Sequence, residues 1–240
     1  MPAPERESAF VLIHSPLLGP TSWAPVAREL ERRGRTAAVP ALLGVAAAEA
    51  PPWGAMQDAV RAAAEPIATP LVLVGHSGGG VLLPMLADAL SADVAGLVFV
   101  DAFLPPPIGS TRLAPAQLIE ELRALAADGV LPPWSSWLGE QWMRELVPDD
   151  RLRTVLEEEM PALPLSYFEA DVPLPSGWHA RPCGYVLLSD QPHAQSAADA
   201  RGRGWPVAEV PGAGHLAIAT DPVALADALL GLERTLARSI

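Results

Sequence analysis

The chain contains no lysine and only one cysteine, Cys183, among its 240 residues. A single cysteine excludes an internal disulfide and is typical of a reducing compartment. No apolar run approaches the ~18 residues of a membrane span, and residues 1–8 show no basic stretch followed by an apolar segment, as a signal peptide would. We therefore expect a cytoplasmic protein.

Positive charge is also scarce, because 16 basic residues face 28 acidic ones and the formal net charge is −12. Such a surface repels phosphate backbones and anionic lipids, so we expect no nucleic-acid partner and no membrane partner. Half of the residues are hydrophobic, which is enough to bury the core of one sizeable domain. The expected partner is a small apolar molecule, and the expected assembly is a monomer or a homodimer.

The most informative motif is GHSGG at residues 75–79. It follows the apolar segment 71–74 and precedes another at 81–83, so it lies between an expected strand and an expected helix. Glycines two residues before and after Ser77 permit a sharp turn that lifts the hydroxyl clear of the backbone. The motif is typical of a nucleophile elbow, and Ser77 is the candidate nucleophile.

A nucleophilic serine needs a base, and the chain offers five histidines. His215 lies in a glycine-containing loop, after the strand-like run 207–210 and before a helical segment that opens near residue 220. A loop position late in the chain allows an imidazole to reach a serine that lies far earlier in the sequence. His215 is therefore the candidate general base.

Four segments together resemble the α/β-hydrolase superfamily, in its branch of small esterases and hydroxynitrile lyases. They are FVLIHSPLLGPTSW at 10–23, the elbow, AGLVFVDAFLP at 95–105 and the His215 loop. The resemblance covers about residues 8–104 and 182–236. It implies the α/β-hydrolase fold with a serine, histidine and carboxylate triad in which the serine precedes the histidine.

The pattern along the chain predicts alternating strands and helices, which indicates an α/β fold with a mostly parallel sheet and helices on both faces. About six strands are expected, near 8–14, 35–40, 70–75, 95–101, 184–189 and 206–210. Helices are expected near 21–33, 55–65, 78–91, 191–203 and 221–237. We assign residues 1–104 and 182–240 to this α/β-hydrolase core.

Between residues 105 and 181 the alternation stops, and helical stretches are interrupted by proline and tryptophan. The superfamily carries its cap at this place, so we interpret 105–181 as a helical cap, or lid, over the active site. Its tryptophans either line an apolar substrate site or attach the cap to the core. The residues expected to contact the substrate are Pro16, His76, Phe103, Trp134, Trp137 and Leu216.

The oxyanion hole departs from the family pattern. It needs one N–H group from the residue after the nucleophile, here Gly78, and a second from the loop after the first strand. In the resembling enzymes the second donor lies two positions after the loop histidine, where this chain has Pro16, which lacks an N–H. Either the Leu17 N–H or the Ser15 hydroxyl takes its place, or acyl transfer is weakened, since one lost donor costs ~100- to 1000-fold in rate.

The acid that orients the base has two candidates. Asp190 follows the strand after which the family usually supplies its acid, but it lies slightly early in that loop. Asp101 ends the strand that follows the elbow helix, at an edge where α/β sheets place functional groups. We favour Asp101 and keep Asp190 as the alternative.

These residues predict a serine hydrolase that cleaves an ester, lactone or thioester of a small to medium apolar acyl compound, with no metal and no organic cofactor. Two alternatives use the same fold. One is a lyase or cyclase of secondary metabolism in which His215 acts as a general base without an acyl-enzyme, which Pro16 favours. The other is a ligand-binding protein with negligible turnover.

Overall fold

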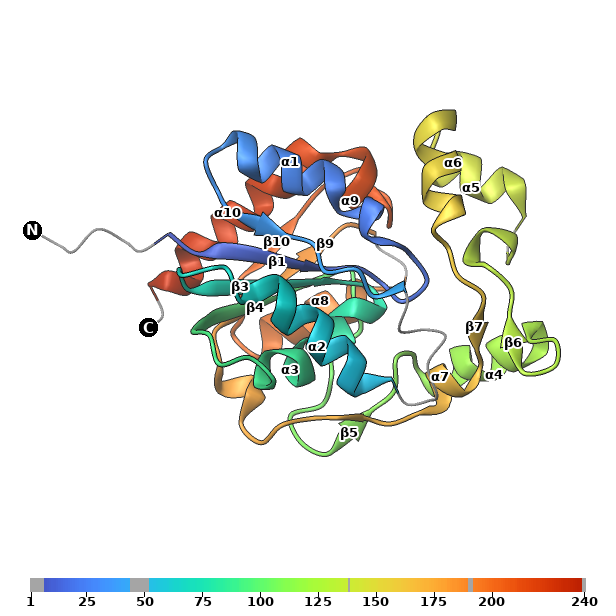
Figure 1. Ribbon diagram of the computed structural model, residues 1–240, viewed down its shortest axis with the longest axis horizontal. Helices are drawn as coiled ribbons and strands as arrows, with labels where there is room; N and C mark the ends of the chain where they lie inside the picture. The colour runs from blue at the N-terminus through green and yellow to red at the C-terminus, as the bar shows by residue number, and fades with distance from the viewer. Residues whose placement is uncertain (1–6, 44–51, 138, 190–191, 239–240) are drawn as a thin grey trace, which may run out of the picture.

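A six-stranded parallel sheet forms the centre of the computed structural model, which describes residues 7–43, 52–137, 139–189 and 192–238. The strand order is β10-β9-β4-β3-β1-β2, and helices cover both faces (Figure 1). The predicted fold class, with its six strands, is confirmed. The strands are β1 (Ala9–Ile13), β2 (Ala37–Ala38), β3 (Leu71–His76), β4 (Val94–Val100), β9 (Cys183–Leu187) and β10 (Val207–Glu209).

The helices divide between the two faces of the sheet. On one side lie α1 (Ala24–Arg32), α9 (Ala217–Thr220) and α10 (Pro222–Ala237), and on the other lie α2 (Trp53–Ala64), α3 (Gly78–Asp88) and α8 (Ala194–Gly202) (Figure 1). Within the described part of the chain, no helix is long and apolar enough to cross a membrane.

Both faces of the sheet are buried because helices cover each of them. Successive side chains of a strand point to opposite faces, so they enter two different hydrophobic clusters. In β1, Val11 and Ile13 join the hydrophobic cluster of α2, α3 and α8. Phe10 and Leu12, between them in sequence, join the cluster of α1 and α10. This explains why the central strands are continuous apolar runs and do not alternate with polar residues.

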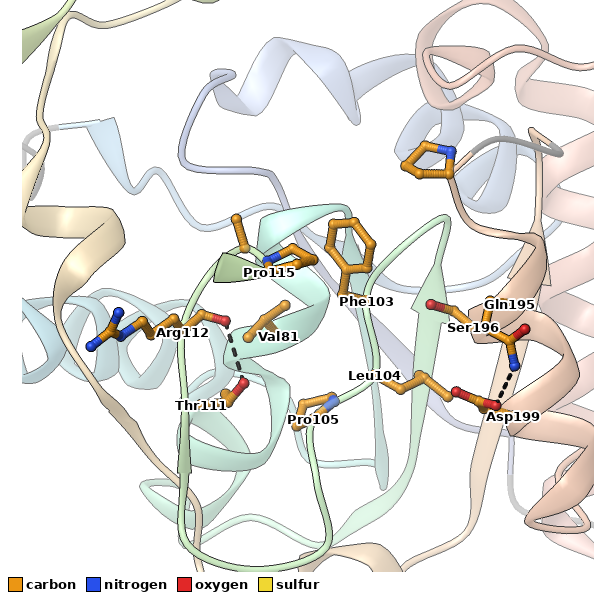
Figure 2. Close-up of a pocket in the computed structure, with 12 residues that line it drawn as sticks. Val81, Phe103, Leu104, Pro105, Thr111, Arg112, Pro115, Gln195, Ser196 and Asp199 are labelled. Atoms are coloured by element: carbon orange, nitrogen blue, oxygen red, sulfur yellow. Dashed lines mark hydrogen bonds between the residues drawn. The ribbon is translucent and has the colours of Figure 1, made fainter. Parts of the chain in front are cut away.

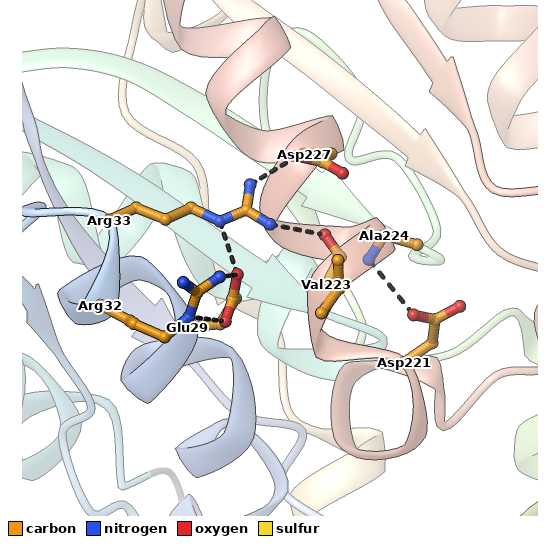
Figure 3. A network of polar contacts seen from close by, with 7 residues as sticks. All are labelled: Glu29, Arg32, Arg33, Asp221, Val223, Ala224 and Asp227. Carbon is orange, nitrogen blue, oxygen red and sulfur yellow. Dashed lines mark hydrogen bonds and ion pairs between the residues drawn. The ribbon is translucent and has the colours of Figure 1, made fainter.

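Charged side chains join α1 to α10 at the surface (Figure 3). Arg33 donates hydrogen bonds to Glu29 in α1 and to Asp227 in α10, and Arg32 donates two more to Glu29. Hydrogen bonds from Arg32 and Arg33 lower the pKa of Glu29 to about 2, so its charge persists in weak acid. Because solvent screens exposed ion pairs, this network orients the two helices more than it stabilises them.

The segment 105–181 leaves the main sheet after β4 and returns to it before β9. Within the segment, two short antiparallel pairs form between its outgoing and returning parts, β5 with β8 and β6 with β7. Most of it lies beyond the carboxyl end of β1 (Figure 1). Its elements are β5 (Ser110–Thr111), α4 (Ala116–Leu125), β6 (Val130–Leu131), η3 (Trp134–Ser136), α5 (Glu140–Leu146), α6 (Asp150–Glu158), β7 (Leu163–Pro164), α7 (Ser166–Glu169), β8 (Val172–Pro173) and η4 (Trp178–Ala180). Its role as a lid stays a prediction.

The same segment packs against both sides of the core. Ile119 and Leu122 of α4 belong to the cluster of α2 and α3, whereas Met143 and Leu156 belong to the cluster of α1 and α10. Just after α6, the carboxylate of Glu159 accepts hydrogen bonds from the Thr21 N–H (2.9 Å) and the Thr21 hydroxyl (2.6 Å). These contacts attach the segment to the chain that follows β1.

Glycine is required where β3 meets α3, and this gives a test of the packing. A Cβ on Gly75 would lie 2.6 Å from the Gly79 carbonyl oxygen, so Gly75→Ala should lower the free energy of unfolding by ~2 kcal/mol or more. A Cβ on Gly231, within α10, meets no described atom within 4 Å, so Gly231→Ala should raise it by about 0.5–1 kcal/mol. Urea unfolding followed by circular dichroism measures both, and equal effects would contradict this account.

Candidate active site

Ser77 occupies the sharp turn between β3 and α3, with φ 52° and ψ −126°. Positive φ is strained for a residue with a Cβ, and the surrounding hydrogen bonds hold it. The Ser77 N–H donates to the Val100 carbonyl (3.0 Å), and the Ser77 carbonyl accepts from the Gly80 N–H (2.9 Å). The half-buried side chain faces a cavity at the carboxyl edge of the sheet.

The glycines after Ser77 allow α3 to begin against its neighbouring strands. A Cβ on Gly79 would lie 2.7 Å from the His14 carbonyl oxygen, and a Cβ on Gly80 would lie 2.5 Å from the Ala102 Cβ. Larger residues would push the start of α3 away from the sheet. The glycines of the motif therefore fix the place from which Ser77 points into the cavity.

The cavity has a volume of about 530 Å³, within the range usual for small-molecule sites. Apolar side chains from the segment 105–181 form most of one wall, and the polar groups gather near Ser77. The predicted site residues that line it are Ser15, Leu17, His76, Ser77, Phe103, Trp134, Trp137 and His215. The wall from the segment 105–181 also includes Leu118, Leu122, Leu125, Trp142 and Leu146.

Two predicted substrate contacts lie elsewhere. Leu216 is fully buried in the cluster of α1 and α10 and is not among the described residues that line the cavity. Its side chain supports the His215 loop from the core. Pro16 is buried with its ring against Gly78 and is likewise absent from the described lining.

Asp101 and His215 meet beside Ser77. His215 Nδ1 lies 2.7 Å from Asp101 Oδ2, although Asp101 directly follows β4 and His215 lies in a loop far along the chain. The buried carboxylate also accepts hydrogen bonds from the N–H groups of Leu188 and Ser189, both at 3.0 Å, and from the Ser189 hydroxyl at 2.5 Å. Four donors thus fix its position.

The ionisation of Asp101 fixes the protonation pattern of His215. Burial raises the pKa of this carboxyl, but the hydrogen bonds from His215 and Ser189 and the nearby imidazoles outweigh it and hold the pKa below its usual value. An ionised carboxylate only accepts, so Nδ1 of His215 carries a hydrogen, and in the neutral imidazole the lone pair is then on Nε2. The alternative acid, Asp190, lies outside the described residues.

Two buried histidines support the loops around the site. His14 Nε2 accepts the Leu42 N–H (3.0 Å), so its Nδ1 donates to the Ser15 carbonyl (2.8 Å). His76 Nε2 donates to the His215 carbonyl (2.9 Å). Burial lowers the pKa of both imidazoles, so they stay neutral and act as fixed hydrogen-bonding groups.

Sequence reasoning gave no role to His193 or Ser189, and both line the cavity. The His193 ring stacks on His215 with a centroid distance of 5.3 Å and an interplanar angle of 10°, and it contacts Phe103 at 5.0 Å. Burial lowers the pKa of His193 to about 4. Neither residue belongs to a recognisable motif, so the folded chain was needed to find them.

The residues of the described chain that could hold a metal are Asp101, His193 and His215, whose ligand atoms lie within 4.8 Å of one another. Ligands around Zn²⁺ lie about 2.0–2.1 Å from the ion, so no two of them are more than ~4.2 Å apart. Asp101 already accepts four hydrogen bonds, one of them from His215 itself, and a metal ion would have to displace them. The arrangement suits proton transfer better than metal binding.

The oxyanion region contains both of the alternatives to Pro16. If Gly78 carried a Cβ, it would lie 3.0 Å from Pro16 Cδ and 3.7 Å from Ser15 Oγ, so the Ser15 hydroxyl is close to Gly78. The Leu17 N–H donates to Ser15 Oγ at 3.3 Å. Because Ser15 Oγ accepts there, its own hydrogen is free to point elsewhere.

The depressed pKa of His193 predicts a pH effect on stability. An unfolded imidazole titrates near 6.5, whereas the folded one titrates at about 4. Between these values the unfolded state binds one more proton, so the stability that His193 contributes is lost as the pH falls, by ~1.4 kcal/mol per pH unit.

His193→Gln removes this proton uptake, so the variant should lose less stability than the wild type between pH 6.5 and 4. Urea unfolding at graded pH measures the slope, and His179→Gln, at an exposed site, controls for the loss of an imidazole. A wild-type slope in the His193 variant would show that this imidazole is protonated in the folded state.

Residues 10–228 match the sequence profile of the Alpha/beta hydrolase family. An Arabidopsis thaliana protein named "Putative methylesterase 19" is 29% identical over 160 residues, which cover 63% of this chain and 57% of that protein. The match therefore spans less than two thirds of that relative's length.

Solved structures agree with the fold. An extracellular alpha/beta-hydrolase from a Paenibacillus species is 20% identical with a TM-score of 0.71, and covers 94% of this chain and 99% of its own. A pyrethroid hydrolase from Sphingobium faniae is 22% identical with a TM-score of 0.66 over 95% and 97% of the two chains. Polyneuridine aldehyde esterase is 18% identical with a TM-score of 0.69 over 94% and 99%. At these identities, the likeness establishes the fold.

Proposed function

Because the chain belongs to the Alpha/beta hydrolase family, we propose that it is a serine esterase acting on a neutral, apolar acyl ester, lactone or thioester. The observation that carries the proposal is the placement of Ser77, on its strained turn, in one cavity with His215, whose Nδ1 is held by buried Asp101. The named relatives include a methylesterase and two hydrolases of esters or pyrethroids, which agrees with this reaction type.

In this proposal His215 Nε2 takes the proton of Ser77 as Oγ attacks the substrate carbonyl. The resulting imidazolium then gives the proton to the leaving alcohol or thiol, and an acyl-enzyme remains on Ser77. Water attacks this ester with His215 again as base, which releases the acid. Asp101 stays ionised and stabilises the imidazolium, and its four hydrogen bonds hold the imidazole in the productive orientation.

We assign the oxyanion hole to the Gly78 N–H and the Ser15 hydroxyl. Pro16 cannot donate, and the Leu17 N–H already binds Ser15 Oγ. That bond orients the hydroxyl and leaves its hydrogen available to the developing negative charge near Gly78. A hydroxyl thus replaces the backbone donor that Pro16 removes.

The cavity wall supports an apolar substrate. Leucine and tryptophan side chains dominate the part contributed by the segment 105–181, with Trp134 and Trp142 packed edge to face at 4.8 Å. Apart from histidine, Glu121 is the one ionisable side chain in the described lining. A carboxylate near the cavity disfavours an anionic acyl group, and the apolar wall disfavours any charged one, so we expect a neutral substrate.

Covalent labelling tests the nucleophile. A fluorophosphonate should label the wild type with one equivalent at Ser77, and Ser77→Ala should lose both the labelling and the hydrolysis of p-nitrophenyl esters, while its melting temperature stays close to that of the wild type. Ser136→Ala, at an exposed site, is the matched control. Mass spectrometry locates the label, and ester turnover by Ser77→Ala would rule out the acyl-enzyme.

A second candidate keeps the site but uses His215 as a general base without an acyl-enzyme, as a lyase or cyclase would. The observation that favours it is Pro16, whose ring occupies the place beside Gly78 where the second backbone donor is expected. Release of a product from a cleavable or cyclisable substrate, with no ester turnover and no acyl-enzyme on Ser77, would favour this candidate.

The acid is tested by substitution. Asp101→Asn should lower kcat by roughly 10⁴-fold, because the amide can hold the imidazole in the wrong tautomer and cannot stabilise an imidazolium. Asp88→Asn, on an exposed turn of α3, should leave kcat unchanged. Steady-state kinetics with melting curves measure both, and a loss below about tenfold in Asp101→Asn would mean that another group, such as Asp190, orients His215.

A further inference from the structure

A second cavity, of about 340 Å³, has Phe103 in its lining (Figure 2). Phe103 and Pro192 line the first cavity as well, so the two cavities are neighbours. The ring centroid of Phe103 lies 5.0 Å from that of His193, and the His193 ring stacks on the His215 ring with a centroid distance of 5.3 Å. One aromatic ring therefore separates Phe103 from the base. A substrate chain that extends from Ser77 toward this wall meets Phe103 close to the reacting carbonyl.

The backbone just before Phe103 is held by hydrogen bonds. Asp101, two residues earlier, accepts four hydrogen bonds. The Tyr185 hydroxyl donates to the Ala102 carbonyl (2.9 Å) and accepts from the Ala102 N–H (3.1 Å). The contacts that hold the Asp101 carboxylate therefore also fix the chain that leads into Phe103.

The lining of the second cavity is mixed, because apolar residues share it with Thr111, Arg112, Gln195, Ser196 and Asp199. Some of these polar groups bond within the lining, since the Gln195 amide donates to Asp199 (2.8 Å) and the Thr111 hydroxyl donates to the Arg112 carbonyl (3.4 Å) (Figure 2). The apolar residues of its lining are Val81, Phe103, Leu104, Pro105, Ala114 and Pro115.

We propose that Phe103 is the residue that sets the upper length of the acyl chain, because its side chain lines both the catalytic cavity and the second cavity, whose apolar residues can contact the end of a longer chain. The proposal rests on the esterase function proposed above. The ring excludes the distal carbons of a long acyl group, and removing it joins the two cavities.

Chain-length selectivity tests the proposal. The substrates are p-nitrophenyl esters with straight acyl chains from acetate to palmitate, and the measured quantity is kcat/KM for long chains divided by kcat/KM for medium chains. This ratio should rise at least ~10-fold in Phe103→Ala, because methylenes that the ring excluded become buried. Phe103→Tyr keeps a ring of the same shape and should retain the wild-type ratio. Phe103→Ala combined with Thr111→Trp, which refills the second cavity from its other side, should return the ratio to the wild-type value.

Three results would overturn the proposal: an unchanged ratio in a folded Phe103→Ala, a raised ratio that Thr111→Trp does not reverse, or a ratio that rises equally in Phe103→Tyr. Binding of n-alkanols of graded length, followed by tryptophan fluorescence, gives the same length comparison without turnover. If fluorophosphonate fails to label Ser77 but Phe103→Ala still binds longer n-alkanols than the wild type does, the proposed esterase function is wrong and the role of Phe103 stands.

Discussion

The hydrogen bonding of the Asp101 carboxylate is the constraint on which the rest of the site depends. One buried group accepts two backbone N–H groups and a hydroxyl from the loop after β9, and a ring N–H from the His215 loop. It thereby joins three segments that are distant in sequence at one edge of the sheet. Each donor lowers the cost of keeping a negative charge in the interior, and together they keep the carboxylate ionised.

Neutral imidazoles hold the loops around the site in place. His14 fixes the Ser15 loop and His76 fixes the backbone of His215, and burial lowers the pKa of each so that both stay neutral. His193, whose pKa burial also lowers, packs on the face of the His215 ring. The site therefore surrounds His215 with imidazoles that burial keeps neutral.

Much of the fold could be predicted from the sequence. The buried strands are continuous apolar runs because both faces of a parallel sheet are covered, and their number and sequence positions agree with the structure. Ser77 and His215 could be proposed from their local settings, a glycine-flanked turn and a loop before the final helix. Leu216 was placed wrongly at the cavity, because its neighbour in sequence points into the site while its own side chain enters the core.

The sequence by itself determined the elements, their order and the strained turn at Ser77, since apolar periodicity and glycine spacing are local properties. Only the tertiary structure decided that Asp101 contacts His215, that Ser189 supplies donors where an acid was expected, and that Phe103 lines two cavities. Those facts depend on which loops meet at the edge of the sheet. The meeting of loops is fixed by strand order and by packing across the whole chain, and no local pattern of residues encodes it.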